Sequence, residues 1–305
     1  MTNPKNTFEE EPCKVIIPLP EEFDLKVNLG YLERNKNECM YEVKNDTIIR
    51  VIAIGEIRTL VQIHVNDKNQ MIVHFLAGKP YETTDVIHNI REWFDLDNDL
   101  TSFYQMAKAD PLLKMPVENF FGLRLIGIPD LFEALCWGVL GQQINLNFAY
   151  TLKKQFVEKF GESMEWEGKK YWIFPSYERI AKLTPSDLAD IKMTVKKSEY
   201  IIGIAQLMTT GELSKEKLRE IGGFKDVEKN LIKIRGIGPW TANYVLMRCL
   251  RFPNAFPIDD VGLINAIKTV LNMDRKPSKD EILKLSTPWR NWESYATFYL
   301  WRVLY

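Results

Sequence analysis

Apolar and β-branched residues form short runs separated by turn residues in the first hundred positions. "LVQIHV" (residues 60–65) and "MIVHFL" (71–76) have the length and composition of strands, and the turn cluster "NDKN" between them predicts a hairpin. "FDLKVNLGYLER" (23–34) and "CMYEVKN" (39–45) predict further strands. The sequence therefore predicts a small α+β sheet domain over residues 1–98.

The apolar spacing becomes helical after the acidic connector "DLDNDL" (95–100). In residues 129–162, Asp130 is a candidate N-cap and Gly161 a candidate stop. Gly141 interrupts this stretch, so "GQQIN" predicts a corner between two helices. The last segment, "WRNWESYATFYLWRVLY", predicts an aromatic helix. Residues 99–305 are thus expected to form a helical body.

A tight glycine turn lies between two amphipathic segments in "VEKNLIKIRGIGPWTANYVLMRCL". Gly236 and Gly238 can adopt positive φ, so the loop can be very short, and they allow another backbone to approach closely. Pro239 suits the first turn of the second helix, because the N–H that proline lacks would have no partner there. Free N–H groups at that helix start are suited to a phosphate. The alternative is an ordinary αα-hairpin in which the glycines only form the turn.

The charge along the chain is uneven, although the formal net charge is only -1. Residues 1–100 hold 11 Lys+Arg against 18 Asp+Glu, and residues 101–305 hold 29 against 23. A basic helical body suits a polyanionic partner, but on charge alone a chance imbalance of solvated side chains is the preferred explanation.

The remaining composition excludes several classes of protein. No apolar run reaches the length of about 18 residues that a membrane helix needs, and the N-terminus lacks the apolar core of a signal peptide. The four cysteines lie far apart, which favours reduced thiols over disulfides or a metal cluster. His64 and His74 are expected to be ordinary strand histidines. These features indicate a cytoplasmic protein.

"GIGPWTANYVLMR" (236–248) followed by "FPIDDVGL" (256–263) resembles the helix–hairpin–helix/Gly-Pro-Asp superfamily of DNA glycosylases, in particular the bacterial DNA-3-methyladenine glycosylase II type. The resemblance implies an α+β N-terminal sheet domain followed by a mainly α-helical glycosylase body, with the hairpin at about 225–250. It also implies that Gly236, Ile237 and Gly238 grip the DNA backbone. No cofactor is required, but a monovalent cation (K⁺ or Na⁺) is often held by loop carbonyls, here those of Ile232, Ile234 and Ile237.

The resemblance places the catalytic aspartate at Asp260. Cleavage of an N-glycosidic bond builds positive charge on the sugar, which a fixed carboxylate stabilises. The alternative is that both carboxylates of "FPIDD" are only helix caps. We expect Asp260 to be catalytic and Asp259 to be the cap.

An aromatic pocket is the second feature that the resemblance implies. An alkylated base is electron-poor and stacks on aromatic faces once it has left the helix. Trp240 and Tyr244 share one helical face, and by resemblance Trp301 supplies a third wall. Core packing is the alternative for every aromatic residue and the expectation for Phe298 and Tyr299.

Two positions distinguish this chain within the superfamily. Relatives that cut the strand carry a lysine at the position of Trp240, so water is the expected nucleophile here. Gln142, Gln143 and Ile144 match the loop that fills the gap left by a flipped base, where some members insert a leucine. The alternative for the two glutamines is capping of a helix end.

These features predict a monofunctional glycosylase that excises alkylated bases of the 3-methyladenine and 7-methylguanine type, in base excision repair. The expected partner is double-stranded DNA, bound by a monomer that contacts no membrane and works at the nucleoid in the bacterial cytosol. A non-enzymatic helix–hairpin–helix DNA-binding module, or a glycosylase for other damaged bases, is the alternative.

Overall fold

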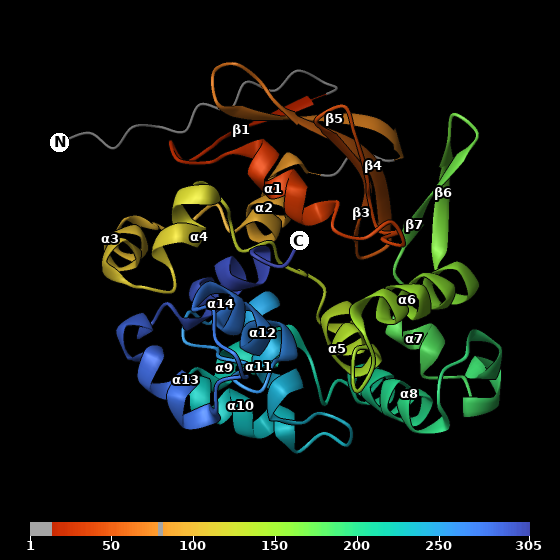
Figure 1. Cartoon of the computed structure of the whole chain (residues 1–305). Helices are drawn as coiled ribbons and strands as arrows, with labels where there is room; N and C mark the ends of the chain where they lie inside the picture. Colours follow the sequence, from red (N-terminus) through yellow and green to blue (C-terminus); the bar gives the residue numbers. More distant parts are fainter. Residues whose placement is uncertain (1–13, 79–81) are drawn as a thin grey trace.

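The computed structural model describes residues 14–78 and 82–305 of the chain; Cys13 lies outside this range. Figure 1 shows the sheet at one edge of the molecule, above a larger group of helices. The N-terminal elements are β1 (Lys14–Pro18), α1 (Leu25–Leu32), β2 (Glu42–Lys44), β3 (Thr47–Ile54), β4 (Ile57–Val65), β5 (Gln70–Gly78) and α2 (Thr83–Phe94).

The five strands form one antiparallel sheet in the order β1-β5-β4-β3-β2. The predicted hairpin is present as β4 and β5, in which Val65 faces Met71 across the turn. His64 and His74 lie on these strands and stack with ring centroids 5.4 Å apart. The order of the sheet brings the first strand beside the last.

The expected strand at residues 23–34 is wrong, because this segment forms helix α1. The side chain of Asp24 accepts the N–H of Val27 and caps the helix. Asn28 is fully buried, and its amide donates to the carbonyls of Asp24 and Gly122. Alternating apolar residues suggested a strand, whereas the cap and the buried polar side chain favour a helix.

The body contains helices in two groups, with α5–α8 on one side and α9–α14 with α3 and α4 on the other (Figure 1). Its elements are α3 (Thr101–Ala109), α4 (Lys114–Asn119), α5 (Leu131–Leu140), α6 (Leu146–Phe160), β6 (Glu162–Trp166), β7 (Lys169–Ile173), α7 (Tyr177–Ile180), η1 (Pro185–Ile191), α8 (Val195–Thr209), α9 (Lys215–Ile221), α10 (Phe224–Ile232), α11 (Pro239–Arg248), α12 (Val261–Val270), α13 (Lys279–Leu285), η2 (Thr287–Trp289) and α14 (Glu293–Arg302).

Three predicted features of the body are confirmed. Asp130 caps α5, Gly161 ends α6, and the aromatic C-terminal segment contains helix α14. The strands β6 and β7 were not predicted, so the body is mainly rather than entirely helical. They form a hairpin whose turn residues Glu167 and Gly168 both have positive φ, and Tyr171 packs it against the outer face of the large sheet.

One continuous core joins the two parts of the chain. The inner face of the sheet, α1 and α2 belong to the same buried cluster as the helices of the body. This shared core holds the N-terminal domain against the helices that carry the candidate site.

Within the described ranges, no helix has both the length and the hydropathy to cross a bilayer.

Candidate active site

Helices α10 and α11 form the predicted hairpin, joined by the loop 233–238. Gly236 has a φ of +94°, and a Cβ there would lie 2.2 Å from the ring of Tyr200. Gly238 has a φ of -90° and does not use this freedom, and a Cβ there would meet no atom within 4 Å. A side chain at position 236 would thus clash with Tyr200, while Gly238 leaves open space beside the first turn of α11.

The apolar sides of the two hairpin helices face the core. Val227 and Leu231 are fully buried before the turn, and Ala242 and Val245 after it. Ile232, at the end of α10, is 39% exposed. Pro239 occupies the first turn of α11 as expected.

The loop between α5 and α6 is tied to this hairpin. The side-chain amide of Gln142 donates to the Gly236 carbonyl at 2.9 Å and to the Thr241 hydroxyl at 3.2 Å. Gln143 is exposed at the tip of the loop with a φ of +57°. Neither glutamine caps a helix, since Gly141 ends α5 and Asn145 begins α6. Gln142 therefore anchors the loop, and Gln143 is free to contact a ligand.

Asp260 lies at the start of α12 and accepts three hydrogen bonds. Its Oδ1 accepts the backbone N–H of Leu263 and the indole N–H of Trp301, both at 2.7 Å. Its Oδ2 accepts the indole N–H of Trp240 at 2.9 Å. Both carboxylate oxygens are thus fixed by groups that can only donate.

Asp259 is not the helix cap, contrary to expectation, because Asp260 caps α12. The carboxylate of Asp259 is exposed and pairs with the Lys279 ammonium group at 3.0 Å. The two neighbouring aspartates therefore have different environments: the carboxylate of Asp260 is fixed by three donors, and that of Asp259 forms an exposed ion pair.

The three predicted aromatic walls are consecutive neighbours in space. The ring centroids of Trp240 and Tyr244 are 5.6 Å apart at an interplanar angle of 29°, and those of Tyr244 and Trp301 are 6.1 Å apart at 32°. Phe298 and Tyr299 are fully buried in the core, which confirms the expectation for both. The three walls stand beside Asp260.

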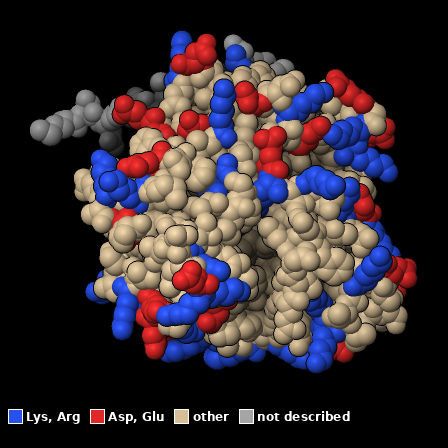
Figure 2. Space-filling view, viewed as in Figure 1, with Lys and Arg blue, Asp and Glu red and all other residues tan. Residues whose placement is uncertain are grey.

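A cleft of about 870 Å³ opens between the α5–α6 loop and helices α11, α12 and α14. Figure 2 shows this face of the molecule hollowed between the helices that Figure 1 labels α12 and α5. The predicted residues that line the cleft are Gln142, Gln143, Ile144, Trp240, Tyr244, Asp260 and Trp301.

The predicted backbone grip lines a second hollow, of about 560 Å³, next to this cleft. It includes the hairpin loop with Gly236, Ile237 and Gly238, and Trp240 borders both spaces. Ile232 and Ile234 also line it. The Ile234 carbonyl accepts the N–H of Ile237 at 3.0 Å, and a carbonyl keeps a second lone pair for a cation. A monovalent cation at this loop stays a prediction.

The sequence did not predict the inner end of the cleft. It is lined by Tyr31, Arg34, Trp137 and Arg248, of which the first two come from the N-terminal domain. Burial raises the pKa of Tyr244 to about 12, although the Arg248 cation opposes this shift. One signal was available: an arginine four residues after Tyr244, on the same helical face and inside an apolar run.

The glycine hairpin thus lies beside an aromatic cleft that holds a fixed aspartate, as the sequence resemblance implies. Residues 136–291 match the HhH-GPD superfamily base excision DNA repair protein, and residues 16–135 match the 8-oxoguanine DNA glycosylase, N-terminal domain. The chain belongs to the HhH-GPD superfamily of base excision DNA repair proteins.

Individual relatives agree with this assignment. The chain is 72% identical over 303 residues to a protein of Bacillus subtilis (strain 168) named DNA-3-methyladenine glycosylase, covering 98% of this chain and 100% of that one. It is 26% identical to DNA-3-methyladenine glycosylase 2 of Escherichia coli (strain K12), covering 92% and 93% of the two chains. A solved structure of 3-methyladenine DNA-glycosylase from Archaeoglobus fulgidus has the same fold, with a TM-score of 0.82 at 24% identity over 94% and 96%.

Proposed function

We propose that this protein is a monofunctional DNA glycosylase that removes alkylated bases from duplex DNA and leaves an abasic site. The observation that carries the proposal is the carboxylate of Asp260, fixed by three donors beside three aromatic rings. The names of its relatives in B. subtilis and E. coli support alkylated bases such as 3-methyladenine as the substrate class.

The chemistry follows from this arrangement. As the N-glycosidic bond lengthens, the sugar gains positive charge, and the Asp260 carboxylate stabilises that charge without moving. The hydrogen bonds from Trp240 and Trp301 hold it in one orientation. Water adds to the anomeric carbon and loses a proton, while the bond's electron pair leaves with the base. Because an alkylated base is already a good leaving group, the cleft needs no cofactor for this step.

Three rings and a loop would hold the flipped nucleotide. Trp240, Tyr244 and Trp301 stack on the base, and Gln143 at the tip of its loop enters the gap left in the duplex. The open space above Gly238 admits a phosphate at the first turn of α11. A monovalent cation at the carbonyls of Ile232, Ile234 and Ile237 would strengthen this grip. We propose that the protein acts as a monomer and that it works in the cytoplasm.

The alternatives explain less of the site. A non-enzymatic DNA-binding module would use the hairpin, but it has no need for a carboxylate held by three donors. A strand-cutting glycosylase for oxidised bases would need an amine nucleophile, and none of the described residues that line the cleft is a lysine.

The test is incubation of the protein with methylated duplex DNA, followed by chromatography of the released bases. Wild-type protein should release 3-methyladenine and 7-methylguanine, and Asp260→Asn should release almost none. A folded wild-type protein that binds duplex DNA and releases no base would contradict the proposal and support the binding module.

A further inference from the structure

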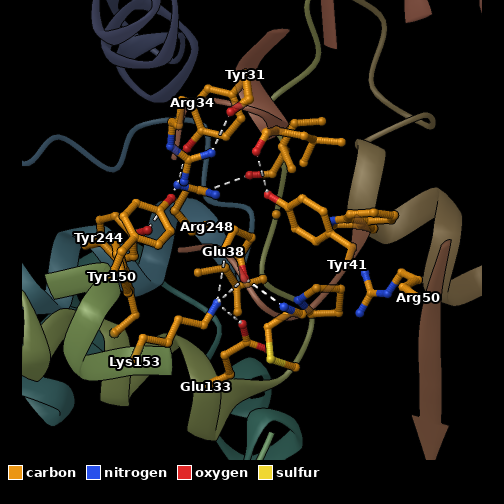
Figure 3. A pocket seen from close by; sticks show the side chains of 18 residues that line it. Tyr31, Arg34, Glu38, Tyr41, Arg50, Glu133, Tyr150, Lys153, Tyr244 and Arg248 are labelled. Atoms are coloured by element: carbon orange, nitrogen blue, oxygen red, sulfur yellow. Dashed lines mark hydrogen bonds and ion pairs between the residues drawn. The ribbon is translucent and has the colours of Figure 1, made fainter. Parts of the chain in front are cut away.

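A cluster of charged and phenolic side chains lies directly behind the inner end of the cleft. It surrounds a small space of about 40 Å³ between the N-terminal domain and helices α5, α6 and α11 (Figure 3). Its cations are Arg34, Arg50, Lys153 and Arg248, and its carboxylates are Glu38 and Glu133. The cluster therefore carries two more positive than negative groups.

Both carboxylates are used by Lys153. Its ammonium group lies 3.3 Å from Glu38 and 3.0 Å from Glu133, and all three side chains are almost completely buried. Burial lowers the pKa of Lys153, but the two carboxylates outweigh this effect and raise it above its ordinary value. Within the described parts of the chain, neither Arg34 nor Arg248 forms a salt bridge. The excess positive charge therefore includes these two arginines.

Arg248 is held by neutral groups and is 3% exposed. Its Nε donates to the Ile126 carbonyl at 2.6 Å, and its Nη1 donates to the hydroxyls of Tyr31 and Tyr244 at 2.8 and 3.0 Å. Its guanidinium carbon lies 5.4 Å from the ring centroid of Tyr244. The Nη2 donors are not used by any described residue.

Arg34 reaches the same place from the loop after α1. Its Nη1 donates to the Tyr31 carbonyl at 2.8 Å, and its guanidinium carbon lies 3.8 Å from the Tyr31 ring centroid. Arg34 and Arg248 both line the cleft that holds Asp260 and the aromatic walls. Figure 3 shows the two guanidinium groups side by side next to Tyr31.

The position of these donors predicts what they contact. With the sugar placed at Asp260, a flipped base would extend along the aromatic rings toward the inner end of the cleft. In a purine, the substituent at position 6 lies at the end remote from the glycosidic nitrogen. A guanidinium group only donates, so it stabilises an oxygen there and opposes an amino group, which also presents hydrogens.

We propose that Arg34 and Arg248 determine base specificity, by favouring flipped bases with a carbonyl oxygen at the remote edge over bases with an amino group there. The inference rests on the proposed glycosylase function and deepens it. 7-Methylguanine and 3-methyladenine are both cationic in DNA, so the positive charge of the two arginines disfavours the binding of both bases alike. The hydrogen-bonding edge is what separates 7-methylguanine, which carries an oxygen at position 6, from 3-methyladenine, which carries an amino group.

Two variants and one matched control test the proposal. Arg248→Gln and Arg34→Gln each remove a guanidinium group from the cleft. Arg50→Gln removes one from the same cluster, where Arg50 lies over the Trp93 ring at 4.2 Å and does not line the cleft. Arg34 is only half-buried, so its variant remains informative if the loss of the deeply buried Arg248 impairs folding.

The measurement is the single-turnover rate of release of both bases from one methylated duplex. The ratio of the 7-methylguanine rate to the 3-methyladenine rate should fall about tenfold in Arg34→Gln and Arg248→Gln, and should stay at the wild-type value in Arg50→Gln. Equal losses on the two bases in folded Arg34→Gln would overturn the inference and leave the glycosylase function intact. A wild-type protein that releases neither base would overturn both.

Discussion

At the outer end of the cleft, Trp240 and Asp260 are 20 residues apart in the chain and share a hydrogen bond of 2.9 Å. At the inner end, Tyr31 and Arg248 are 217 residues apart and share one of 2.8 Å. The outer end places one carboxylate between two indole donors, whereas the inner end places two arginines among tyrosines. A short motif thus supplies the carboxylate that we propose acts in bond cleavage, and contact between distant segments supplies the groups that we propose face the base.

The largest expected effect is on the rate of base release and comes from a substitution at the outer end of the cleft. Asp260→Asn should lower the single-turnover rate of base release by about 10³-fold, because the amide cannot stabilise the charge on the sugar. Asparagine is also a good N-cap, so the melting temperature and the affinity for an abasic duplex should change little. Turnover close to wild type in this variant would transfer the catalytic role to Asp259.

The next effect is on stability and concerns the charged cluster. Lys153→Met leaves two buried carboxylates without their cation and should lower the free energy of unfolding by about 3 kcal/mol in denaturant titrations. Adding Glu38→Gln and Glu133→Gln should restore much of this loss. A loss below about 1 kcal/mol in the single variant would show that the carboxylates find other partners.

The same cluster predicts a dependence on pH. Burial raises the pKa of Glu38, but Lys153 and the N–H groups of Met40 and Cys39 outweigh it, and the net shift is downward. A carboxyl whose pKa is lowered on folding stabilises the protein above its ordinary pKa, and this contribution is lost as the pH falls. The stability difference between wild type and Lys153→Met should therefore narrow from about pH 6 to about pH 3, and a constant difference would contradict this.

The two glycines of the hairpin should behave differently. Gly238→Val adds a side chain in open space, so the fold should be kept. Its binding to duplex DNA should weaken about tenfold whatever the DNA sequence, and the loss should be clearest at low salt. Gly236→Val should instead destabilise the protein, because its Cβ would meet the Tyr200 ring. Normal binding of an abasic duplex by folded Gly238→Val would show that the hairpin is only structural.

The smallest effect is expected at Asp259. Its ion pair with Lys279 is exposed, and such pairs contribute about 0–1 kcal/mol. Asp259→Asn should therefore change the unfolding free energy by less than about 1 kcal/mol and leave base release within about twofold of wild type. It is the matched control for Asp260→Asn, and a large loss of activity in it would remove the distinction between the two aspartates.

The sequence predicted those parts of the molecule whose signals are local. The hairpin of β4 and β5, the cap at Asp130 and the turn before Pro239 depend on neighbouring residues, and all three are present. Helix α1 was missed because its apolar residues also alternate, and its stability depends on Asn28 contacting the distant Gly122. Arg34 was missed for a related reason: its position in the cleft depends on how the N-terminal domain packs against the body.

In the proposed reaction, water cleaves the glycosidic bond beside Asp260 and no amine of the protein takes part. It is tested most directly by incubating the protein with methylated duplex DNA in two parallel reactions, one with borohydride, which traps a Schiff base, and one without it. We predict no covalent adduct in the reaction with borohydride. In the reaction without it, we predict released base and an intact strand that breaks only after alkali or heat. A trapped protein–DNA adduct would contradict the account and make the protein a lyase.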